Sequence, residues 1–361
     1  MKVAVYRDPA DLAGLRDEWA ALHRRSGDGS ASTGPDYCMV ALTHALPRHA
    51  APFVIAAWSD TDGRLTGIWP MWLTPEGGRS VGHHVGIGSH EENSEPLASD
   101  AASMAAMLKS AEDACDVLIV NNVRPEGLLF AAIRGRKPWR IHKSRIRSPI
   151  TRCAGAGSWD AWLAGRSRKF RQDIRSEGRR LARLGDLRIG RVEGAEIAPF
   201  VDWLFDQKTA WLAAWSDQAS WLHAPECRAF VKAALADEAT RLVGHGIWLD
   251  GRLVAAALCL KSAVHEYMVT VYDPAFAACS PGHQITGHCV AEAIAEGCDF
   301  DFRITHDSYK LRWIDDFDLR YSLTLANTLR GVPALVPLHI RTARKTLTRW
   351  RDGLRRKRVA G

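Results

Sequence analysis

The sequence lacks the cysteine patterns and the long apolar runs that mark several large classes of protein. Its eight cysteines form no C-x-x-C pair and no cluster with zinc-ligand spacing. The longest apolar runs, such as Leu253 to Leu260, are far shorter than a membrane span. Residues 1–8 contain no sustained apolar segment, so we expect no cleaved secretory signal. These absences predict a cytoplasmic protein with reduced thiols.

The composition is that of a globular protein of about two domains. The chain has 361 residues, which is too long for one ordinary core. Of these residues, 47% are hydrophobic and 25% are charged, as in a globular protein. Residues 330–361 carry ten Lys or Arg and one acid, a net charge of +9, whereas the whole chain sums to +7. The rest of the chain is therefore slightly acidic, which argues against a general nucleic-acid-binding protein.

The hydrophobic patterns predict two mixed α/β halves, at 1–150 and 158–330, followed by a basic amphipathic helix at 334–358. Asp250-Gly251 is the strongest hairpin signal. Expected strands are 3–6, 53–58, 65–73, 117–120, 139–146, 187–192, 241–249, 252–261, 265–272, 300–304 and 320–325, and expected helices are 8–25, 125–134, 168–184, 197–215, 225–236 and 282–296. The fold class is α/β (α+β), with mostly antiparallel mixed sheets flanked by helices, and the similar style of the halves indicates a structural duplication.

A phosphate-binding helix start is predicted where a strand ends at Tyr272 and a helix begins near Gly282. Backbone N–H groups at a helix start bind pyrophosphate, and glycine allows a ligand to approach closely. Ser280, Gly282 and His283 are therefore the candidate cofactor-binding residues. Taken alone the signal is weak, because Ser-Pro-Gly before a helix is more often an ordinary cap.

Several runs of residues resemble one family of acyltransferases when they are taken in order. They are Tyr272 to Pro274, Ser280 to Gly282, Asp299 to Arg303, Tyr309 to Trp313 and, upstream, Ser167 to Arg171. Over about Trp159 to Ala326 the chain resembles the GNAT-type acyltransferases grouped with the cellulose-biosynthesis protein CelD. Those are in turn similar to the FemAB peptidyltransferases, which place two GNAT units side by side. The usual loop, Gln/Arg-x-x-Gly-x-Gly/Ala, is incomplete here, and only Gly282 matches it.

The resemblance implies two GNAT-like lobes and the transfer of an acyl group to an amine. The implied donor is acetyl-CoA or another acyl-CoA, a co-substrate rather than a tightly bound cofactor. The implied acceptor is an amino sugar or a lipid-linked sugar destined for an exopolysaccharide. Two alternatives stay open: peptidyl transfer from aminoacyl-tRNA, as in FemAB, and a degenerate scaffold that binds a nucleotide and regulates exopolysaccharide production. In the first of these, tRNA is the one nucleic acid expected as a partner.

Candidate catalytic groups gather on the strand end near 300 and the loop after it. Acyl transfer needs a base for the attacking amine and stabilisation of the tetrahedral oxyanion. His306 is a candidate base because its ordinary pKa lies near neutrality, and Asp301 is one if burial raises its pKa. Tyr309 is a candidate acid for the leaving thiolate, and Lys310 or Arg303 for holding a phosphate. The plainer alternative is a solvated, salt-bridged loop.

Basic and aromatic side chains on two expected helices are candidate acceptor-binding groups. The run 166–183 has eight Lys or Arg against two acids, and its basic face suits the phosphate of a nucleotide sugar, a lipid-linked sugar or tRNA. Lys208 and Trp211 lie on the other helix, where core packing is the alternative to an aromatic platform. The candidate substrate-binding residues are Arg168, Lys169, Arg171, Arg175, Lys208, Trp211 and Arg303.

Two further segments carry predictions of their own. Gly82 to His84 and His90 to Glu92 are predicted to form an irregular polar loop facing substrate, and we predict no metal site, because no helical pair of histidines occurs. In the tail, Ile340, Ala343 and Leu347 recur at helical spacing among basic residues. Such a helix suits an anionic inner-membrane surface, so we expect peripheral membrane association. Nucleic acid, an acidic partner protein or a simply docked helix are the alternatives.

Overall fold

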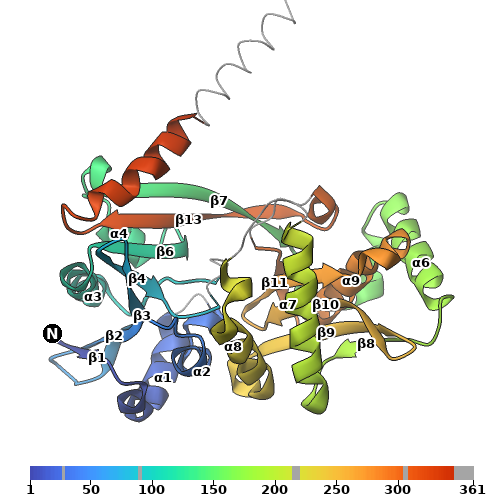
Figure 1. Ribbon diagram of the computed structural model, residues 1–361, viewed down its shortest axis with the longest axis horizontal. Helices are drawn as coiled ribbons and strands as arrows, with labels where there is room; N and C mark the ends of the chain where they lie inside the picture. Colours follow the sequence, from blue (N-terminus) through green and yellow to red (C-terminus); the bar gives the residue numbers. More distant parts are fainter. Residues whose placement is uncertain (27–28, 88–91, 214–219, 304–307, 345–361) are drawn as a thin grey trace, which may run out of the picture.

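The computed structural model describes residues 1–26, 29–87, 92–213, 220–303 and 308–344, with the backbone alone at 220, 308 and 309. Within them the strands form one continuous mixed sheet with helices packed on both faces (Figure 1). The order is β1-β2-β3-β4-β6-β13-β7-β12-β11-β10-β9-β8, and β5 pairs with β3. The strands are β1 (Lys2–Tyr6), β2 (Ala51–Trp58), β3 (Leu65–Glu76), β4 (Arg79–His84), β5 (Leu97–Ala98), β6 (Val117–Val123), β7 (Ile141–Thr151), β8 (Leu187–Arg191), β9 (Leu242–Leu249), β10 (Arg252–Leu260), β11 (Val264–Tyr272), β12 (Asp299–Asp301) and β13 (Asp316–Ala326).

The helices begin at residues that satisfy or do not need the first backbone N–H groups. Asp100, Ser158 and Ser167 accept from backbone N–H groups at the starts of α3, α5 and α6, and Pro occupies the first turn of α2, α8 and α9. The helices are α1 (Arg16–Ser26), α2 (Pro35–His44), α3 (Ala101–Ala114), α4 (Leu128–Ala132), α5 (Trp159–Ala164), α6 (Arg168–Ala182), α7 (Ile197–Ala213), α8 (Pro225–Ala236) and α9 (Pro281–Ala295). Two 3-10 segments matter below, η7 (Pro274–Cys279) and η8 (Ser308–Arg312).

The two halves of the chain repeat one order of elements. Four antiparallel strands, a helix, a parallel strand and a final long strand occur as β1–β4, α3, β6, β7 and again as β8–β11, α9, β12, β13. All neighbouring strands are antiparallel except the pairs β4–β6 and β11–β12. The predicted fold class, a mixed and mostly antiparallel sheet flanked by helices in two similar lobes, is confirmed. We call β1–β4, α3 and β6 with their helices the N-terminal lobe, and β8–β12 with α5–α9 the C-terminal lobe.

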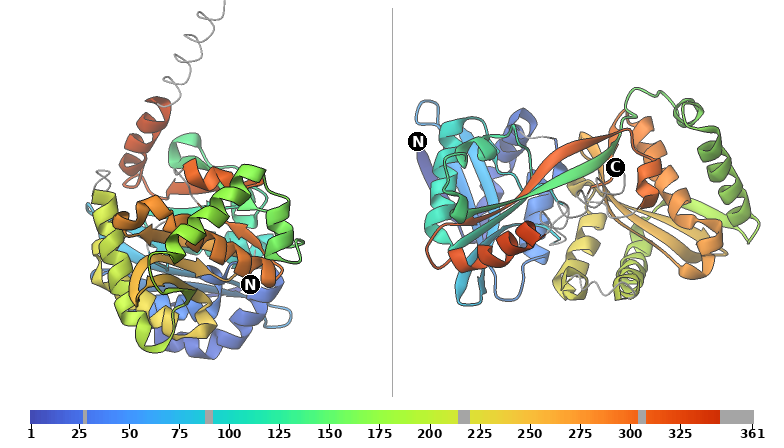
Figure 2. Two further views of the ribbon diagram at one scale, coloured as in Figure 1. Left: turned by 90° about the vertical axis from the view of Figure 1, so that its right-hand side faces the viewer. Right: turned by 90° about the horizontal axis from the view of Figure 1, so that it is seen from above.

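The last strand of each half lies beside the parallel strand of the other half. β13 pairs with β7 from Asp316 to Leu325 and with β6 on its other side, while β7 pairs with β12 through Thr151 and Ile150. Figure 2 shows β7 and β13 as a twisted ribbon that spans both lobes. The centre of the sheet therefore combines strands from before and after residues 151–157. The domain limits 1–150 and 158–330 describe the order along the chain and stay a prediction.

The hydrophobic core holds the two lobes together. Its largest cluster runs from α1, α2 and β2–β3 to α7, α8 and β10–β11, and the ring of Tyr37 meets that of Phe230 edge to face at 5.1 Å. A second cluster under α6 and α9 contains an aromatic group in which Trp162 stacks on Trp313 and Phe170 meets Trp313 edge to face. Because each such fully buried side chain contributes about 1.5–3 kcal/mol, this packing fixes the elements around the candidate site.

Two other expectations meet the structure here. Gly82 to His84, predicted to be an irregular loop, belong to β4, because β3 and β6 pair with these residues from either side. The predicted C-terminal helix is described over 332–344, where the ring of His142 on β7 contacts His339 and Thr342, and the remainder of 334–358 lies outside the described residues. No helix in the described part of the chain is long and apolar enough to cross a membrane.

Candidate active site

The candidate site lies where β11 and β12 separate. The two strands pair in parallel at only three positions, from Val264 to Glu266 on β11 and from Asp299 to Asp301 on β12. β11 then continues to Tyr272, and beyond Glu266 no described strand pairs with its β12-facing edge. Its backbone N–H and C=O groups on that edge are placed for an extended ligand to bind as a strand would.

The start of α9 lies at the end of β11. Ser280 precedes the helix in the left-handed region (φ 50°), and its side chain makes no capping bond to the helix. Gly282 packs against the Tyr272 ring, where a Cβ atom would come within 3.3 Å of Cδ1. The first turn of α9 therefore approaches β11 closely and lacks the side-chain cap that closes many helix starts, as an anion-binding position requires.

A row of contacts joins the start of α9 to Lys310. The Thr286 hydroxyl donates to the Gly282 carbonyl at 2.7 Å and contacts the Tyr267 hydroxyl at 3.1 Å. The Lys310 ammonium lies 5.8 Å from the centre of the Tyr267 ring, and only 8% of Lys310 is exposed. Sequence reasoning predicted that the backbone amides near Gly282 and the polar loop ending at Lys310 face one common cleft. The structure links the two segments through the buried side chains of Thr286 and Tyr267, and the common cleft stays a prediction.

Arg303 and Asp301 form a buried charged cluster at the end of β12. Asp301 accepts from the Ser148 hydroxyl at 2.5 Å and from the Arg303 backbone N–H at 2.6 Å. The Arg303 guanidinium lies 3.1 Å from the Glu266 carboxylate and donates to the Asn93 side-chain oxygen at 3.2 Å. Arg303 is 2% exposed and has a positive φ of 59°, which these bonds hold in place. A substrate phosphate, which Arg303 was predicted to hold, would have to compete for the guanidinium with the carboxylate and amide groups that already surround it.

The N-terminal lobe contributes to this cluster through residues 92 and 93. Glu92 accepts from the Tyr37 hydroxyl, and its carbonyl accepts from the Asn122 side chain; the Asn93 carbonyl accepts from the Ser32 hydroxyl. Burial, and next the Glu92 carboxylate, raise the pKa of Tyr37 well above its usual value. Sequence reasoning expected a polar, substrate-facing loop here but named neither Asn93 nor Glu266. For Asn93 the sequence shows only a run of acidic and amide residues without a periodic pattern of apolar residues, and such a run does not indicate burial.

The basic helix α6 lies beside the start of α9. Glu177 on α6 meets the His283 ring at 3.1 Å, and Gln284 donates to the Ile174 carbonyl. Of the predicted substrate-binding residues, Arg168, Lys169 and Arg175 are exposed. Arg171 instead donates to the carbonyls of Ala164 and Arg166, so the structure gives it a local role at the junction of α5 and α6.

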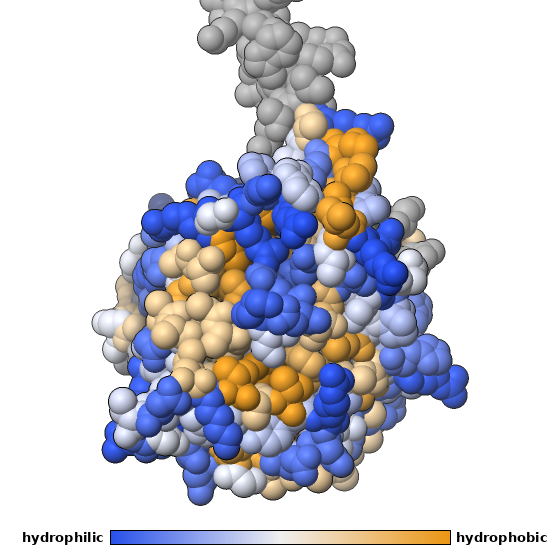
Figure 3. Space-filling model, turned by 90° about the vertical axis from the view of Figure 1, so that its left-hand side faces the viewer, coloured by the Kyte–Doolittle hydropathy of each residue, from blue (hydrophilic) through white to orange (hydrophobic). Residues whose placement is uncertain are grey.

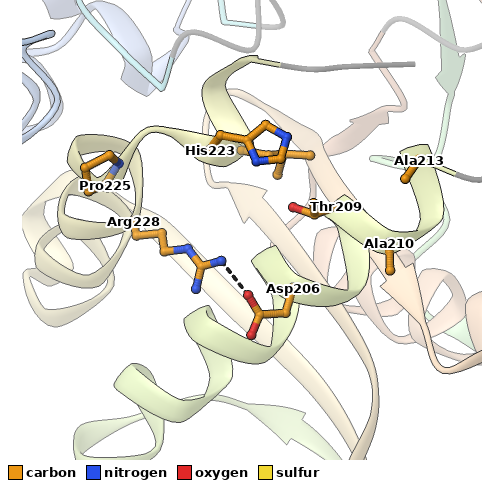
Figure 4. Close-up of a pocket in the computed structure, with 8 residues that line it drawn as sticks. Asp206, Thr209, Ala210, Ala213, His223, Pro225 and Arg228 are labelled. Atoms are coloured by element: carbon orange, nitrogen blue, oxygen red, sulfur yellow. Dashed lines mark hydrogen bonds and ion pairs between the residues drawn. The ribbon is translucent and has the colours of Figure 1, made fainter. Parts of the chain in front are cut away.

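Lys208 on α7 reaches the open stretch of β11. Its ammonium donates to the Thr270 carbonyl at 3.3 Å and lies 4.4 Å from the centre of the Trp211 ring. The opposite face of α7 lines a separate surface hollow of about 540 Å³, closed on one side by an Arg228–Asp206 ion pair (Figure 4). Because Asp206, Thr209 and Ala210 share that face of the helix, the hollow is not part of the opening between β11 and β12.

Two predicted catalytic residues cannot be placed. His306 lies outside the described residues, and at Tyr309 only the backbone of η8 is described. Within the described part of the chain, Asp301 and Arg303 bond to each other at the end of β12, and Lys310 is linked to the helix start at 280–283 through Tyr267 and Thr286. Lys208 reaches β11 from α7.

Comparison with known proteins agrees with this geometry. Residues 168–311 match the model of the acetyltransferase (GNAT) domain family, and the match spans α6 to η8, with every element around the opening. No curated protein matches the chain. The C-terminal lobe therefore carries a GNAT acetyltransferase domain, and the predicted enzyme class, an N-acyltransferase, is confirmed.

Solved structures show the same two-lobed fold. The structure of FemX is similar with a TM-score of 0.60 at 11% identity, over 93% of this chain and 100% of that one. The C-terminal domain of a putative lysylphosphatidylglycerol synthetase from Agrobacterium fabrum gives 0.53 at 12% identity, over 92% and 97%. A conserved protein of unknown function from Bacteroides thetaiotaomicron gives 0.52 at 16% identity, over 90% and 100%. At such identities the likeness concerns the fold alone.

Proposed function

We propose that this N-acyltransferase takes its acyl group from an acyl-CoA, with acetyl-CoA as the first candidate, and transfers it to the amino group of a sugar or polysaccharide precursor. The observation that carries the donor assignment is the open edge of β11 beside the start of α9. The pantetheine arm of CoA contains two amides that can bond along β11, and its diphosphate suits the first turn of α9.

The acceptor assignment is supported by the resemblance to CelD-type proteins and by charge. Arg168, Lys169 and Arg175 are exposed on α6, beside the helix that starts at the opening. Guanidinium and ammonium groups of this kind bind the diphosphate of a nucleotide sugar or a lipid-linked sugar. The resemblance carries the choice of an amino sugar, and the exposed cations are compatible with it.

In the proposed reaction the acceptor nitrogen attacks the thioester carbonyl and forms the new C–N bond. Backbone N–H groups on the open edge of β11 stabilise the resulting oxyanion. The C–S bond then breaks, the CoA sulfur takes a proton and the acceptor nitrogen loses one. We propose His306 as the base and Tyr309 as the acid, and Lys310 as a cation beside the reacting thioester. The bonds of Asp301 to Ser148 and Arg303 favour a positioning role for it over that of base.

The test combines binding and turnover. Calorimetry with CoA and acetyl-CoA measures donor binding, and release of free thiol is followed with a panel of nucleotide-linked and lipid-linked amino sugars. We expect CoA to bind and thiol to appear only when an amino sugar is present. Absence of CoA binding together with transfer from aminoacyl-tRNA overturns the acyl-CoA assignment in favour of peptidyl transfer, and nucleotide binding without any turnover favours a regulator.

We also propose that the enzyme works at the cytoplasmic face of the membrane, held there by its C-terminal helix. Val336 and Ile340 on the 332–344 helix are 50% and 48% exposed, and Figure 3 shows an apolar strip on that helix below the grey trace. Residues 341–358 add nine Lys or Arg. Vesicles containing phosphatidylglycerol should sediment the protein, phosphatidylcholine vesicles should not, and V336D/I340D should abolish sedimentation. Leu184→Asp, at an equally exposed apolar residue after α6, is the matched control.

A further inference from the structure

A histidine and two cysteines meet inside the C-terminal lobe, away from the opening between β11 and β12. They are His245 on β9, Cys259 on β10 and Cys289 on α9, with exposures of 0%, 2% and 1%. One ring nitrogen and the two sulfur atoms all lie within 4.8 Å of one another. Buried free thiols are ordinary in a core, but a fully buried imidazole between two of them is not, because its polar nitrogens need partners.

The fold brings these residues together from distant parts of the chain. His245 pairs with Ala257 in the β9–β10 ladder, and Cys259 lies two residues further along β10, so His245 and Cys259 share one face of the sheet. α9 packs on β9 and β10 and adds Cys289 from above. The spacing 245, 259 and 289 matches no zinc motif, which explains why sequence reasoning predicted no metal.

A fourth residue orients the imidazole. The Glu292 carboxylate lies 3.0 Å from His245 Nε2, and Glu292 is held by Arg191 at 2.6 Å and Lys261 at 3.3 Å. Both ring nitrogens of His245 are buried, and the imidazole lies between the Glu292 carboxylate and the Cys259 thiol. A histidine that binds a metal usually has a carboxylate or carbonyl on its second nitrogen, and Glu292 occupies that position here.

We propose that His245, Cys259 and Cys289 bind one Zn²⁺ ion, with a water molecule as the fourth ligand. Zn–S distances of about 2.3 Å and Zn–N distances of about 2.0–2.1 Å place the ligand atoms roughly 3.5–4 Å apart, a small contraction of the present cluster. Two thiolates and one Zn²⁺ sum to zero charge, whereas a monovalent ion such as Cu⁺ leaves a net negative charge in an apolar core. The ion ties α9, whose first turn borders the candidate active site, to β9 and β10.

The first measurement is the zinc content of the untagged full-length protein, purified under reducing conditions and analysed by mass spectrometry. We expect about one zinc per chain in the wild type and less than about a tenth in C259S/C289S and in His245→Ala. Cys153→Ser is the matched control, because Cys153 is equally buried in the hydrophobic cluster under α6 and α9 but is not one of the three proposed ligands. Retention of zinc in C259S/C289S overturns the proposal.

A second measurement does not depend on the folding of a variant. Wild-type protein is stripped with a chelator and titrated with Co²⁺, which replaces Zn²⁺ in such sites and gives thiolate-to-cobalt absorption bands. We expect these bands at one equivalent and their loss on adding Zn²⁺. A protein that contains no zinc and takes up neither ion under reducing conditions overturns the proposal, as does a permanent Cys259–Cys289 disulfide under those conditions. Neither result bears on CoA binding, so the proposed function is tested separately.

Discussion

The two lobes follow one order of elements and differ at the places where an acyl donor would bind. β4 ends at His84, one residue after its last pair with β6, whereas β11 continues for six residues after its last pair with β12. Asp100 caps α3, since its carboxylate accepts from the Ser103 N–H, whereas α9 begins without a side-chain cap. In the N-terminal lobe the strand thus ends beside its partner and the helix start is capped by a side chain, whereas the C-terminal lobe has neither feature.

The lobes also differ in what they give the candidate site. The C-terminal lobe supplies the strand edge and the helix start, while the N-terminal lobe supplies Asn93, which accepts from the Arg303 guanidinium. Ser148, on strand β7 between the lobes, donates to Asp301. If the C-terminal lobe binds the acyl donor as proposed, the N-terminal lobe supports that site through Asn93.

The largest expected effect comes from separating the halves. A fragment of residues 1–157 lacks β13, so β6 and β7 each lose a pairing partner along most of their length. Unpaired strand edges of this kind aggregate, and we expect the fragment to be insoluble when expressed alone and soluble when co-expressed with 158–361. Soluble yield and circular dichroism measure this. A chain ending at 344, which keeps every described strand, is the control; a soluble, folded 1–157 fragment would show that the lobes are independent.

The next effect concerns the charged cluster between the lobes. Replacing Arg303 by Met removes the guanidinium that lies beside the buried carboxylates of Glu266 and Asp301, so we expect a loss of about 3–5 kcal/mol in the free energy of unfolding. Arg152→Met is the control: Arg152 pairs with Asp299 and Asp318 at the exposed end of β7, and its loss should cost less than about 1 kcal/mol. Urea unfolding measures both. Equal, small effects would mean that the Arg303 cluster does not couple the lobes.

The sequence predicts the local elements of this fold but not the order of its central strands. Periodicity and turn chemistry located most strands and helices, and Asp250-Gly251 indeed forms a hairpin turn with both φ values positive (49° and 77°). The exchange of β7 and β13 could not be predicted, because a strand's pattern shows which face is buried but not which strand lies next to it.

The site divides in the same way. Gly282, Lys310 and Asp301 follow local patterns that a sequence displays, namely a helix start and a strand end. Asn93 and Glu266 do not, because their burial depends on a contact between lobes some 170 residues apart in sequence. Polar residues are ordinarily placed at the surface when only the sequence is considered, so a buried polar cluster is invisible until the partners are known.

His84, where β4 stops, gives a pH test of the closed lobe. Burial lowers its pKa from 6.5 to about 4, so the folded protein keeps His84 neutral while the unfolded chain protonates it. The unfolded state then binds more protons between pH 6.5 and 4, and stability falls as pH falls through this window, by at most about 3 kcal/mol. In His84→Gln the drop in the free energy of unfolding from pH 7 to 4.5 should be smaller by most of that amount. If the free energy of unfolding depends on pH equally in His84→Gln and in the wild type, His84 is in contact with water in the folded protein.

A smaller effect bears most directly on the difference between the lobes. Ser280→Asp gives α9 the acidic residue that α3 already has in Asp100, and its charge competes with an anion at the first turn. We expect CoA to bind about 10–100-fold more weakly, corresponding to roughly 1.4–2.7 kcal/mol. Ser280→Asn is the control. Asn has the shape of Asp and tolerates a positive φ equally well, but it carries no charge, so it should change the affinity for CoA little.

The reciprocal variant changes the cap of α3 instead of α9, and calorimetry measures its CoA binding. Asp100→Ser removes the acidic cap of α3 and should lower the free energy of unfolding by less than about 1 kcal/mol without creating a CoA site, because β4 still ends at His84 and offers no open strand edge. Equal CoA binding by S280D and S280N would mean that the diphosphate is held elsewhere than at α9. Since the strand edge of β11 would remain, the donor would then be fixed by its pantetheine arm alone, and the two features that distinguish the lobes would have separate functions.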